Sequence, residues 1–400
     1  MMEKSIKSTI NSSSKIYMLT FISFLVGIAQ FVFGGILDKV AESVGVYVST
    51  AGQLTTTFSL AAAIGTPVFM MLTAKMDRRK QLLVALTIIF LGMFFTFSLH
   101  GFGLLMFSRV LLGIGSGVYN VCAFAIVASI APEGRKARSI SNLAMGSSAA
   151  LVFGVPIGRV IASQYDWRII FGITSFLTLI SIFCVMRLIP MVEGEAPIPL
   201  GKQLSILKRS DISMALGVTF LMFVSYSVVN TYITPFMKSV IPSIEESISI
   251  VLFALGLASL VGSKLGGFLA DRIGAARTLI GGIIVQVISL TIVSLFSTSE
   301  MVVVLFLIIW ATAAWTCGPM LNYNLVSKAP EASGILLSLN STFVQLGFAV
   351  GAVVGGIVVE GASIMAISWT RMITVTIAAC VGIFSFGFIR LGSRLEKQGS

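Results

Sequence analysis

Long uninterrupted runs of apolar residues constrain the fold of this chain more than any other feature. One of them, KQLLVALTIIFLGMFFTFSL at residues 80–99, has the length of a helix that crosses a bilayer, about 20 residues. In lipid every backbone N–H and C=O must be paired within the protein, so only helices and closed barrels can span it. Barrel strands alternate apolar and polar residues over about ten positions, and these runs do not alternate. The sequence therefore predicts an all-α membrane protein.

Composition supports the same conclusion. Hydrophobic residues make up 56% of the chain and charged residues only 11%, against roughly 25% charged residues in soluble domains. A soluble fold cannot hide that much apolar surface from water. Hydropathy predicts twelve transmembrane helices, at residues 16–37, 50–73, 80–99, 102–127, 139–162, 168–189, 212–236, 247–269, 276–297, 301–324, 334–359 and 368–390.

The middle of the chain divides these spans into two sets of six. Residues 190–211 are rich in proline and charge, so we expect a linker there, between six-helix halves at 16–189 and 212–390, with tails at 1–15 and 391–400. Most of the 27 lysines and arginines fall on one side if both termini are cytoplasmic, and this predicts that orientation in a plasma membrane. The net charge of +11 then reflects topology and anionic lipid. Its scatter over short loops gives no reason to expect nucleic-acid binding.

Two charged turns interrupt the apolar pattern at corresponding places in the two halves. The second, GSKLGGFLADRIGAARTL at 262–279, has a degraded copy, FMMLTAKMDRRKQLLV at 69–84, with Ala74 where Asp271 stands. Both turns follow the second span of a half and lie on the same predicted side. The repeat indicates two pseudo-symmetric halves, the arrangement of many secondary transporters.

Several motifs resemble one transporter family. GGFLADRIGAAR at 266–277 resembles the loop motif Gly-x-Leu-Ala-Asp-Arg-x-Gly-x-x-Arg of the major facilitator superfamily. SRVLLGIGSGVYN at 108–120 and MGSSAALVFGVPIGRV at 145–160 resemble the fourth-helix and fifth-helix motifs of its twelve-helix drug/proton antiporter branch. Across the chain the similarity is closest to the bacterial purine, arabinose and sugar efflux permeases. The resemblance implies a transporter of the bacterial inner membrane that exports a small organic solute by proton antiport and alternating access.

The charged turns are expected to act as a cytoplasmic latch, as the resemblance implies. Arginines can satisfy the unpaired carbonyls at helix ends, and an Asp can stabilise a helix N-terminus. In the second copy Asp271 and Arg272 are expected to make these contacts, and Gly267 and Gly274 to let the helices and the turn approach closely. The first copy retains Arg78 and Arg79. The alternative is ordinary positive charge on the cytoplasmic side.

The fifth-helix motif predicts a bendable face of small residues, at Gly154, Pro156 and Gly158. Small residues let helices cross closely, and proline removes one backbone hydrogen bond. The family links this face to export through packing against the opposite half. A generic packing seam is the alternative reading.

The residues expected to couple transport to protons depart most from the pattern of the family. Arg109 lies within the fourth span, where an unpaired charge is costly and so indicates a function or carbonyl partners. Many antiporters of this branch have a Glu in the first helix, but the corresponding residue here is Gln30, which cannot titrate. Asp38, near the outer end of the first span, is the candidate carboxylate, with Arg109 or Arg159 as its partner. An uncoupled facilitator is the alternative.

Polar and aromatic residues inside the spans suggest a cavity for a neutral, planar or amphiphilic solute. Amide side chains offer paired donors and acceptors, and rings offer stacking faces. The candidate substrate-binding residues are Gln30, Phe31, Tyr119, Asn120, Tyr226, Asn230, Trp315, Asn322 and Gln345. Each of them could instead serve helix packing.

Motifs for nucleotide hydrolysis, metal binding or nucleophilic catalysis are not evident, so we expect no enzyme, cofactor or metal. The expected partners are a small-molecule substrate, protons and the lipid bilayer, and the expected oligomeric state is a monomer. Two further alternatives remain, an importer of the same fold and a receptor that does not transport.

Overall fold

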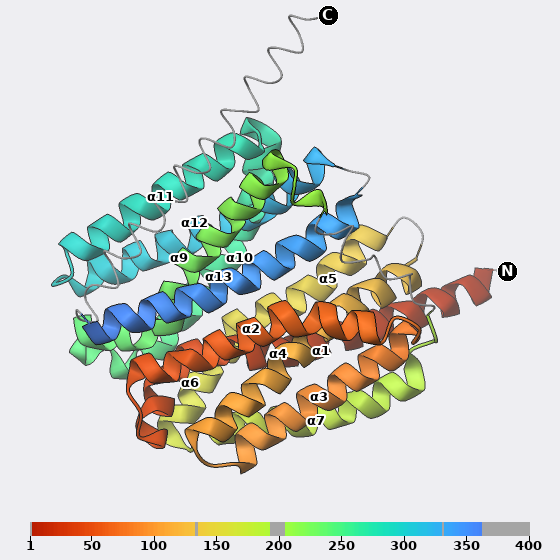
Figure 1. Cartoon of the computed structure of the whole chain (residues 1–400), viewed down its shortest axis with the longest axis horizontal. Coiled ribbons are helices and arrows are strands. Elements are labelled where there is room, and N and C mark those ends of the chain that lie inside the picture. The colour runs from red at the N-terminus through yellow and green to blue at the C-terminus, as the bar shows by residue number, and fades with distance from the viewer. Residues whose placement is uncertain (1, 133–134, 193–204, 330–331, 362–400) are drawn as a thin grey trace, which may run out of the picture. The chain divides into compact units, whose positions relative to one another are not determined.

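The computed structural model describes residues 2–132, 135–192, 205–329 and 332–361, which form helices joined by short turns (Figure 1). Eleven helices in this part of the chain are long and apolar enough to cross a membrane. The all-α membrane fold predicted from the sequence is confirmed. The predicted twelfth span at 368–390 and the predicted tail at 391–400 lie outside the described residues.

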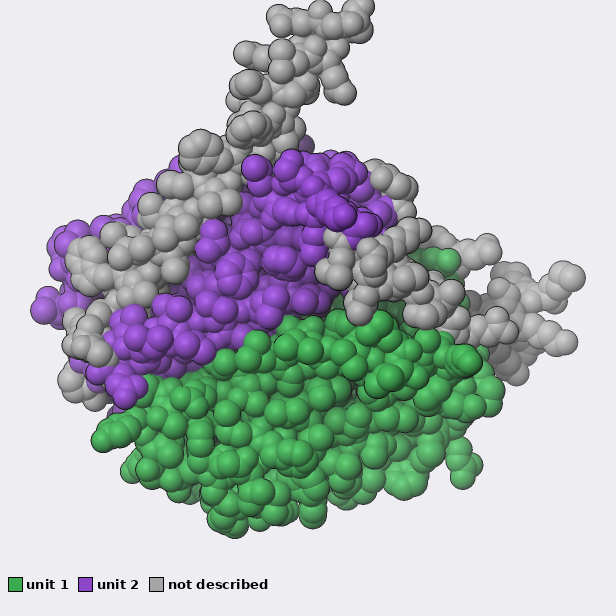
Figure 2. Space-filling view, in the orientation of Figure 1, with its two compact units in different colours: residues 1–197 green, residues 198–400 purple. Residues whose placement is uncertain are grey.

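The chain divides into two compact units, residues 1–197 and 198–400, which Figure 2 shows in different colours. The described helices of unit 1 are α1 (Met2–Val44), α2 (Val48–Leu72), α3 (Arg78–Ser98), α4 (Phe102–Ile130), α5 (Lys136–Ala149), the π-turn η1 (Ala150–Gly154), α6 (Val155–Gln164) and α7 (Arg168–Leu188). Those of unit 2 are α9 (Ser210–Val240), the short η2 (Pro242–Glu246), α10 (Ile248–Ile273), α11 (Ala275–Leu295), α12 (Glu300–Lys328) and α13 (Ser333–Gly361).

The two units use the same helix pairings. In unit 1, α1 packs against α5 and α6, and α4 packs between α2 and α3. In unit 2, α9 packs against α13, and α12 packs between α10 and α11. In this comparison α1 corresponds to α9, and α4 corresponds to α12. Because corresponding helices have corresponding packing partners in the two units, the pairings support an internal repeat.

Glycines make these crossings close. A Cβ on Gly113 would collide with the Phe58 carbonyl across the α2–α4 crossing, and one on Gly262 would collide with the Thr312 carbonyl across the α10–α12 crossing. The α9–α13 crossing is also close, since a Cβ on Gly347 would lie 2.7 Å from the Phe220 carbonyl oxygen. Small residues serve here as they do in other membrane bundles, by letting backbones approach.

The predicted fifth span is not one regular helix. The π-turn at Ala150–Gly154 separates α5 from α6 and ends two residues before Pro156. Because proline has no N–H to give to the preceding turn, the helix absorbs the lost hydrogen bond by a local change of register. The π-turn therefore lies in the motif that the sequence singled out as bendable.

Candidate functional site

An ion pair joins α1 to α6 in unit 1. Arg159 donates from Nη1 to Asp38 Oδ1 at 2.6 Å, and the same nitrogen lies 3.4 Å from the Gly35 carbonyl oxygen. The Arg159 side chain is 1% exposed and the Asp38 side chain 13%. Of the two arginines that the sequence offered to Asp38, the structure selects Arg159. A short pair with this little water around it is sensitive to the loss of either charge.

Arg109 has a different environment. It is fully buried on α4, where Nη1 donates to the Ala29 carbonyl of α1 at 2.6 Å and Nε donates to the Leu54 carbonyl of α2 at 3.2 Å. Its guanidinium carbon lies 4.4 Å from the centre of the Phe33 ring and 4.6 Å from that of Phe58. Pairing of Arg109 with Asp38, one of the two sequence alternatives, is therefore not found. Backbone carbonyls and aromatic rings stabilise this charge.

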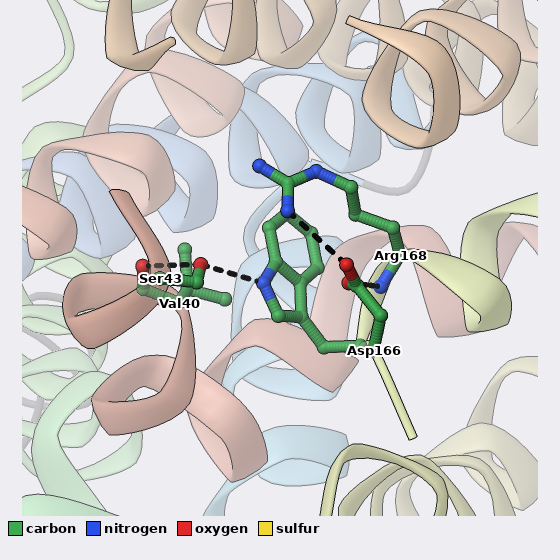
Figure 3. A network of polar contacts seen from close by, with 5 residues as sticks. Val40, Ser43, Asp166 and Arg168 are labelled. Carbon is green, nitrogen blue, oxygen red and sulfur yellow. Dashed lines mark hydrogen bonds and ion pairs between the residues drawn. The ribbon is translucent and has the colours of Figure 1, made fainter. Parts of the chain in front are cut away.

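A network at the end of α1 fixes the segment that carries Asp38 (Figure 3). Trp167 donates from Nε1 to Ser43 Oγ at 2.8 Å, and Ser43 donates to the Val40 carbonyl. Beside them, Arg168 pairs with Asp166, and its guanidinium carbon lies 4.7 Å from the Trp167 ring centre. None of these residues was among the site residues predicted from the sequence. The only signal for them in the sequence is YDWRIIF, a polar and aromatic stretch at the start of the sixth span.

The remaining unit 1 candidates fall into two kinds. Gln30 and Phe31 are half-buried on α1, directly after the Ala29 carbonyl that Arg109 holds. Asn120 is half-buried on α4. Tyr119, in contrast, is fully buried and donates to the Leu19 carbonyl at 2.8 Å, so its hydroxyl serves packing between α4 and α1.

Unit 2 contains an aromatic cluster centred on Tyr226 of α9. The Tyr226 ring stacks on Trp310 with ring centres 5.6 Å apart, and it meets Trp315 and Phe348 edge-on at 6.0 and 5.8 Å. Trp315 donates from Nε1 to the Tyr226 hydroxyl at 3.2 Å, and that hydroxyl lies 3.4 Å from Asn230 Oδ1. The cluster brings together three of the predicted residues, Tyr226, Asn230 and Trp315, from two helices.

Among the described residues, no hydrogen bond joins the last two unit 2 candidates to this cluster. Asn322 is exposed and accepts a hydrogen bond from Asn340 at 2.8 Å, about two helical turns beyond Trp315 along α12. Gln345 is half-buried on α13, one turn before Phe348, and its Oε1 is buried without a hydrogen-bond partner among the described residues.

The first charged turn is closely tied to its own unit. Asp77 is the N-cap of α3 and accepts from the Lys80 amide at 2.9 Å. Arg79 donates from Nη2 to the Met186 carbonyl, in the last turn of α7. The amide of Arg78 donates to the Val192 carbonyl at 2.9 Å.

The second charged turn is open. Asp271 and Arg272 are exposed, and the guanidinium carbon of Arg272 lies 4.6 Å from the Phe268 ring centre on the same helix. Gly274 ends α10 with φ of 88°, a conformation that favours glycine. The close approach expected at Gly267 is not seen among the described residues. It belongs instead to its neighbour Gly266, where a Cβ would collide with the Thr316 carbonyl.

The fifth-helix residues pack inward against α1. A Cβ on Gly154 would lie 2.8 Å from Ile28 Cγ1, and one on Gly158 would collide with Val32. Pro156 is buried between them. Gly154 and Gly158 therefore let η1 and α6 approach α1 closely, at the crossing that Asp38 and Arg159 bridge.

Comparison with known proteins identifies the family. The model of the Major Facilitator Superfamily matches residues 19–352 and 215–398. The chain is 40% identical to the uncharacterized MFS-type transporter YbcL of Bacillus subtilis over 372 residues, 93% of this chain and 95% of that protein.

Two solved structures show the same fold. A point mutant of the nucleoside transporter NupG aligns with a TM-score of 0.76 at 13% identity, over 94% of this chain and 100% of its own. A bacterial homologue of the human lysosomal transporter Spinster aligns with a TM-score of 0.74 at 18% identity, over 93% of this chain and 96% of its own. The chain belongs to the major facilitator superfamily and is a multi-pass membrane transporter.

Proposed function

We propose that this transporter exports a small organic solute across the plasma membrane in exchange for protons, with both chain termini in the cytoplasm. The observation that carries the coupling is the 2.6 Å pair between Asp38 and Arg159. Asp38 is a carboxylate inside a membrane-spanning helix, and it faces a buried positive charge on another helix. Gln30 cannot take a proton and serves instead as a hydrogen-bonding group.

Protonation is the step that links proton movement to helix movement. A proton that binds the Asp38 carboxylate removes its negative charge, and the attraction to Arg159 falls with it. α1 and α6 then lose the contact that holds them together at this level. Arg109 keeps its charge throughout and fixes α1 and α2 to α4 through the Ala29 and Leu54 carbonyls.

The Tyr226 cluster is the proposed substrate-recognition element. Half-buried rings at Tyr226 and Trp315 offer stacking faces, and Asn230 offers an amide beside them. Neither charge nor metal is needed to bind a neutral planar compound in such a place. Purine bases and nucleosides are the first compounds to test, with sugars and drug-like molecules as the other classes. Nucleosides merit inclusion because one structural neighbour is named a nucleoside transporter.

Counterflow in proteoliposomes, with purines, nucleosides, pentoses and phenicol drugs, identifies the solute. The same vesicles with an imposed pH gradient then test coupling in Asp38→Asn. We expect this variant to lose gradient-driven transport and to keep counterflow, because only the proton-binding step is removed. Asp166→Asn is the matched control, since Asp166 also pairs with an arginine but is 54% exposed.

The outcomes separate the alternatives. Gradient-driven transport that survives in Asp38→Asn removes Asp38 from the coupling mechanism. A wild-type protein that ignores the gradient is an uncoupled facilitator. Accumulation in right-side-out vesicles would identify an importer, and solute binding without counterflow would identify a receptor.

A further inference from the structure

The first charged turn binds the end of the last helix of its own unit. Met186 lies in the final turn of α7, where carbonyls have no partner within the helix. Arg79 donates to that carbonyl from the start of α3. A charged donor on such a carbonyl forms a stronger hydrogen bond than a neutral one, and it also complements the negative end of the helix dipole.

The turn is held rigid from inside. Gln81 is fully buried and donates from Nε2 to the Thr73 carbonyl at 2.8 Å. Arg78 donates from Nη1 to Gln81 Oε1 at 3.1 Å, and its amide reaches the Val192 carbonyl. The backbone of residues 73–81 is therefore fixed on both sides of the arginine pair.

Residues 189–192, which follow α7, contact this turn and the core of unit 1. Ile189 is 2% exposed and belongs to the apolar core of unit 1, and Val192 packs against the same core. Together with the Arg78–Val192 hydrogen bond, these contacts hold residues 189–192 on the unit after the helix has ended.

A similar device occurs where the chain enters unit 2. Arg209 donates to the carbonyl of Lys328, the last residue of α12, at 3.1 Å, and also pairs with Asp211 at 3.0 Å. Ile206 and Leu207 pack against the apolar core at that end of the unit. In both units an arginine at the start of a helix binds a carbonyl at the end of another helix beside the linker.

We propose that Arg79 and Arg209 are positioning residues that anchor the two ends of the linker, each to its own unit. The first charged turn has lost the latch pattern at Ala74 and uses its arginines for this purpose. Movements of one unit then reach the linker through the ends of α7 and α3, and those of the other unit through the end of α12. The proposal does not rest on the direction of transport or on proton coupling.

Hydrogen exchange tests the anchor directly in the full-length protein. In Arg79→Ala the amides of residues 186–192 and the amide of Arg78 are expected to exchange about tenfold faster, because a charge-assisted hydrogen bond is lost. Arg79→Lys keeps one donor and should restore most of the protection. Arg187→Ala is the matched control, since Arg187 is an exposed arginine at the same helix end.

Transport provides the second measurement. We expect Arg79→Ala to lower the maximal counterflow rate by about threefold at unchanged KM, with recovery in Arg79→Lys. Arg209→Ala should do the same while the exchange change moves to residues 205–213. Unchanged exchange at 186–192 in Arg79→Ala, or an equal change in Arg187→Ala, would overturn the proposal. If Arg79→Ala does not fold, Arg79→Gln takes its place, since it removes the charge and shortens the donor: exchange at residues 186–192 equal to that of wild type would then overturn the proposal.

Discussion

Unit 1 and unit 2 share a scaffold but bury different chemistry. Unit 1 buries Arg109, Arg159 and Arg168, whereas the described part of unit 2 buries no charged side chain. The eighth residue of α4 is Arg109, and the eighth residue of α12 is Leu307, which is equally buried. In unit 1, backbone carbonyls and Asp38 stabilise the buried arginines Arg109 and Arg159. Unit 2 has the uncharged Tyr226 cluster instead. A repeat thus conserves helix crossings while its two copies diverge in polar function, and this favours coupling in unit 1 and recognition in unit 2.

The largest expected effect comes from an attempt to make unit 2 resemble unit 1. Leu307→Arg places a charge in an apolar interior, where the described part of unit 2 buries no carboxylate to pair with it, and we expect it to cost about 3 kcal/mol or more of stability. The reverse change, Arg109→Leu, should cost less, about 1–2 kcal/mol, because the Ala29 and Leu54 carbonyls lie within helices and keep their helical partners.

Thermal unfolding in one detergent, followed by the fraction of monodisperse protein, measures both changes. Leu307→Met is the control, since it changes shape and adds no charge. If Leu307→Arg were as stable as wild type, the division of the two units into charged and apolar interiors would have no energetic basis.

An intermediate effect tests the shared scaffold. Gly113→Ala and Gly262→Ala each push a methyl group into a carbonyl of the neighbouring helix, so we expect both to lose about 1–3 kcal/mol. Gly281→Ala is the control, because a Cβ there meets nothing within 4 Å and alanine favours the helix. The midpoints of thermal unfolding give the comparison. A loss in only one of the two units would mean that the crossings are not equivalent.

Features that follow from one physical rule could be predicted from the sequence, whereas features that depend on how the helices pack could not. Apolar run length predicted the spans, because lipid leaves the backbone no other option. An arginine partner for Asp38, either Arg109 or Arg159, could be predicted, but the choice of Arg159 could not, since it depends on how α6 approaches α1 across Gly158. Tyr226 and Trp315 could be named as candidate residues, but the ring contacts of Tyr226 with Trp310 and Phe348 could not, because they require three helices to be placed.

The charged turns show the same limit. Sequence resemblance favoured the second copy as the functional one, because it keeps the motif of the family. The structure gives the first copy more contacts within its own unit. Its contacts with Met186 and Val192 could not be predicted, since these residues lie more than a hundred positions from the turn. Loss of a motif residue does not imply loss of a role.

The smallest expected effect distinguishes the two turns themselves. Asp77 caps α3 through the Lys80 amide, so Asp77→Ala should cost about 1 kcal/mol of stability. Asp271 is exposed and makes no hydrogen bond or ion pair among the residues that the structure describes, so Asp271→Ala should change stability by less than about 0.5 kcal/mol. Asp77→Asn, which retains a capping oxygen, separates the cap from the charge. The measurement is thermal unfolding of the three variants under the same conditions. If Asp271→Ala lost as much stability as Asp77→Ala, the Asp271 carboxylate would have to make a structural contact. The contrast between a first turn that is bound to its own unit and a second turn that is open would then be removed.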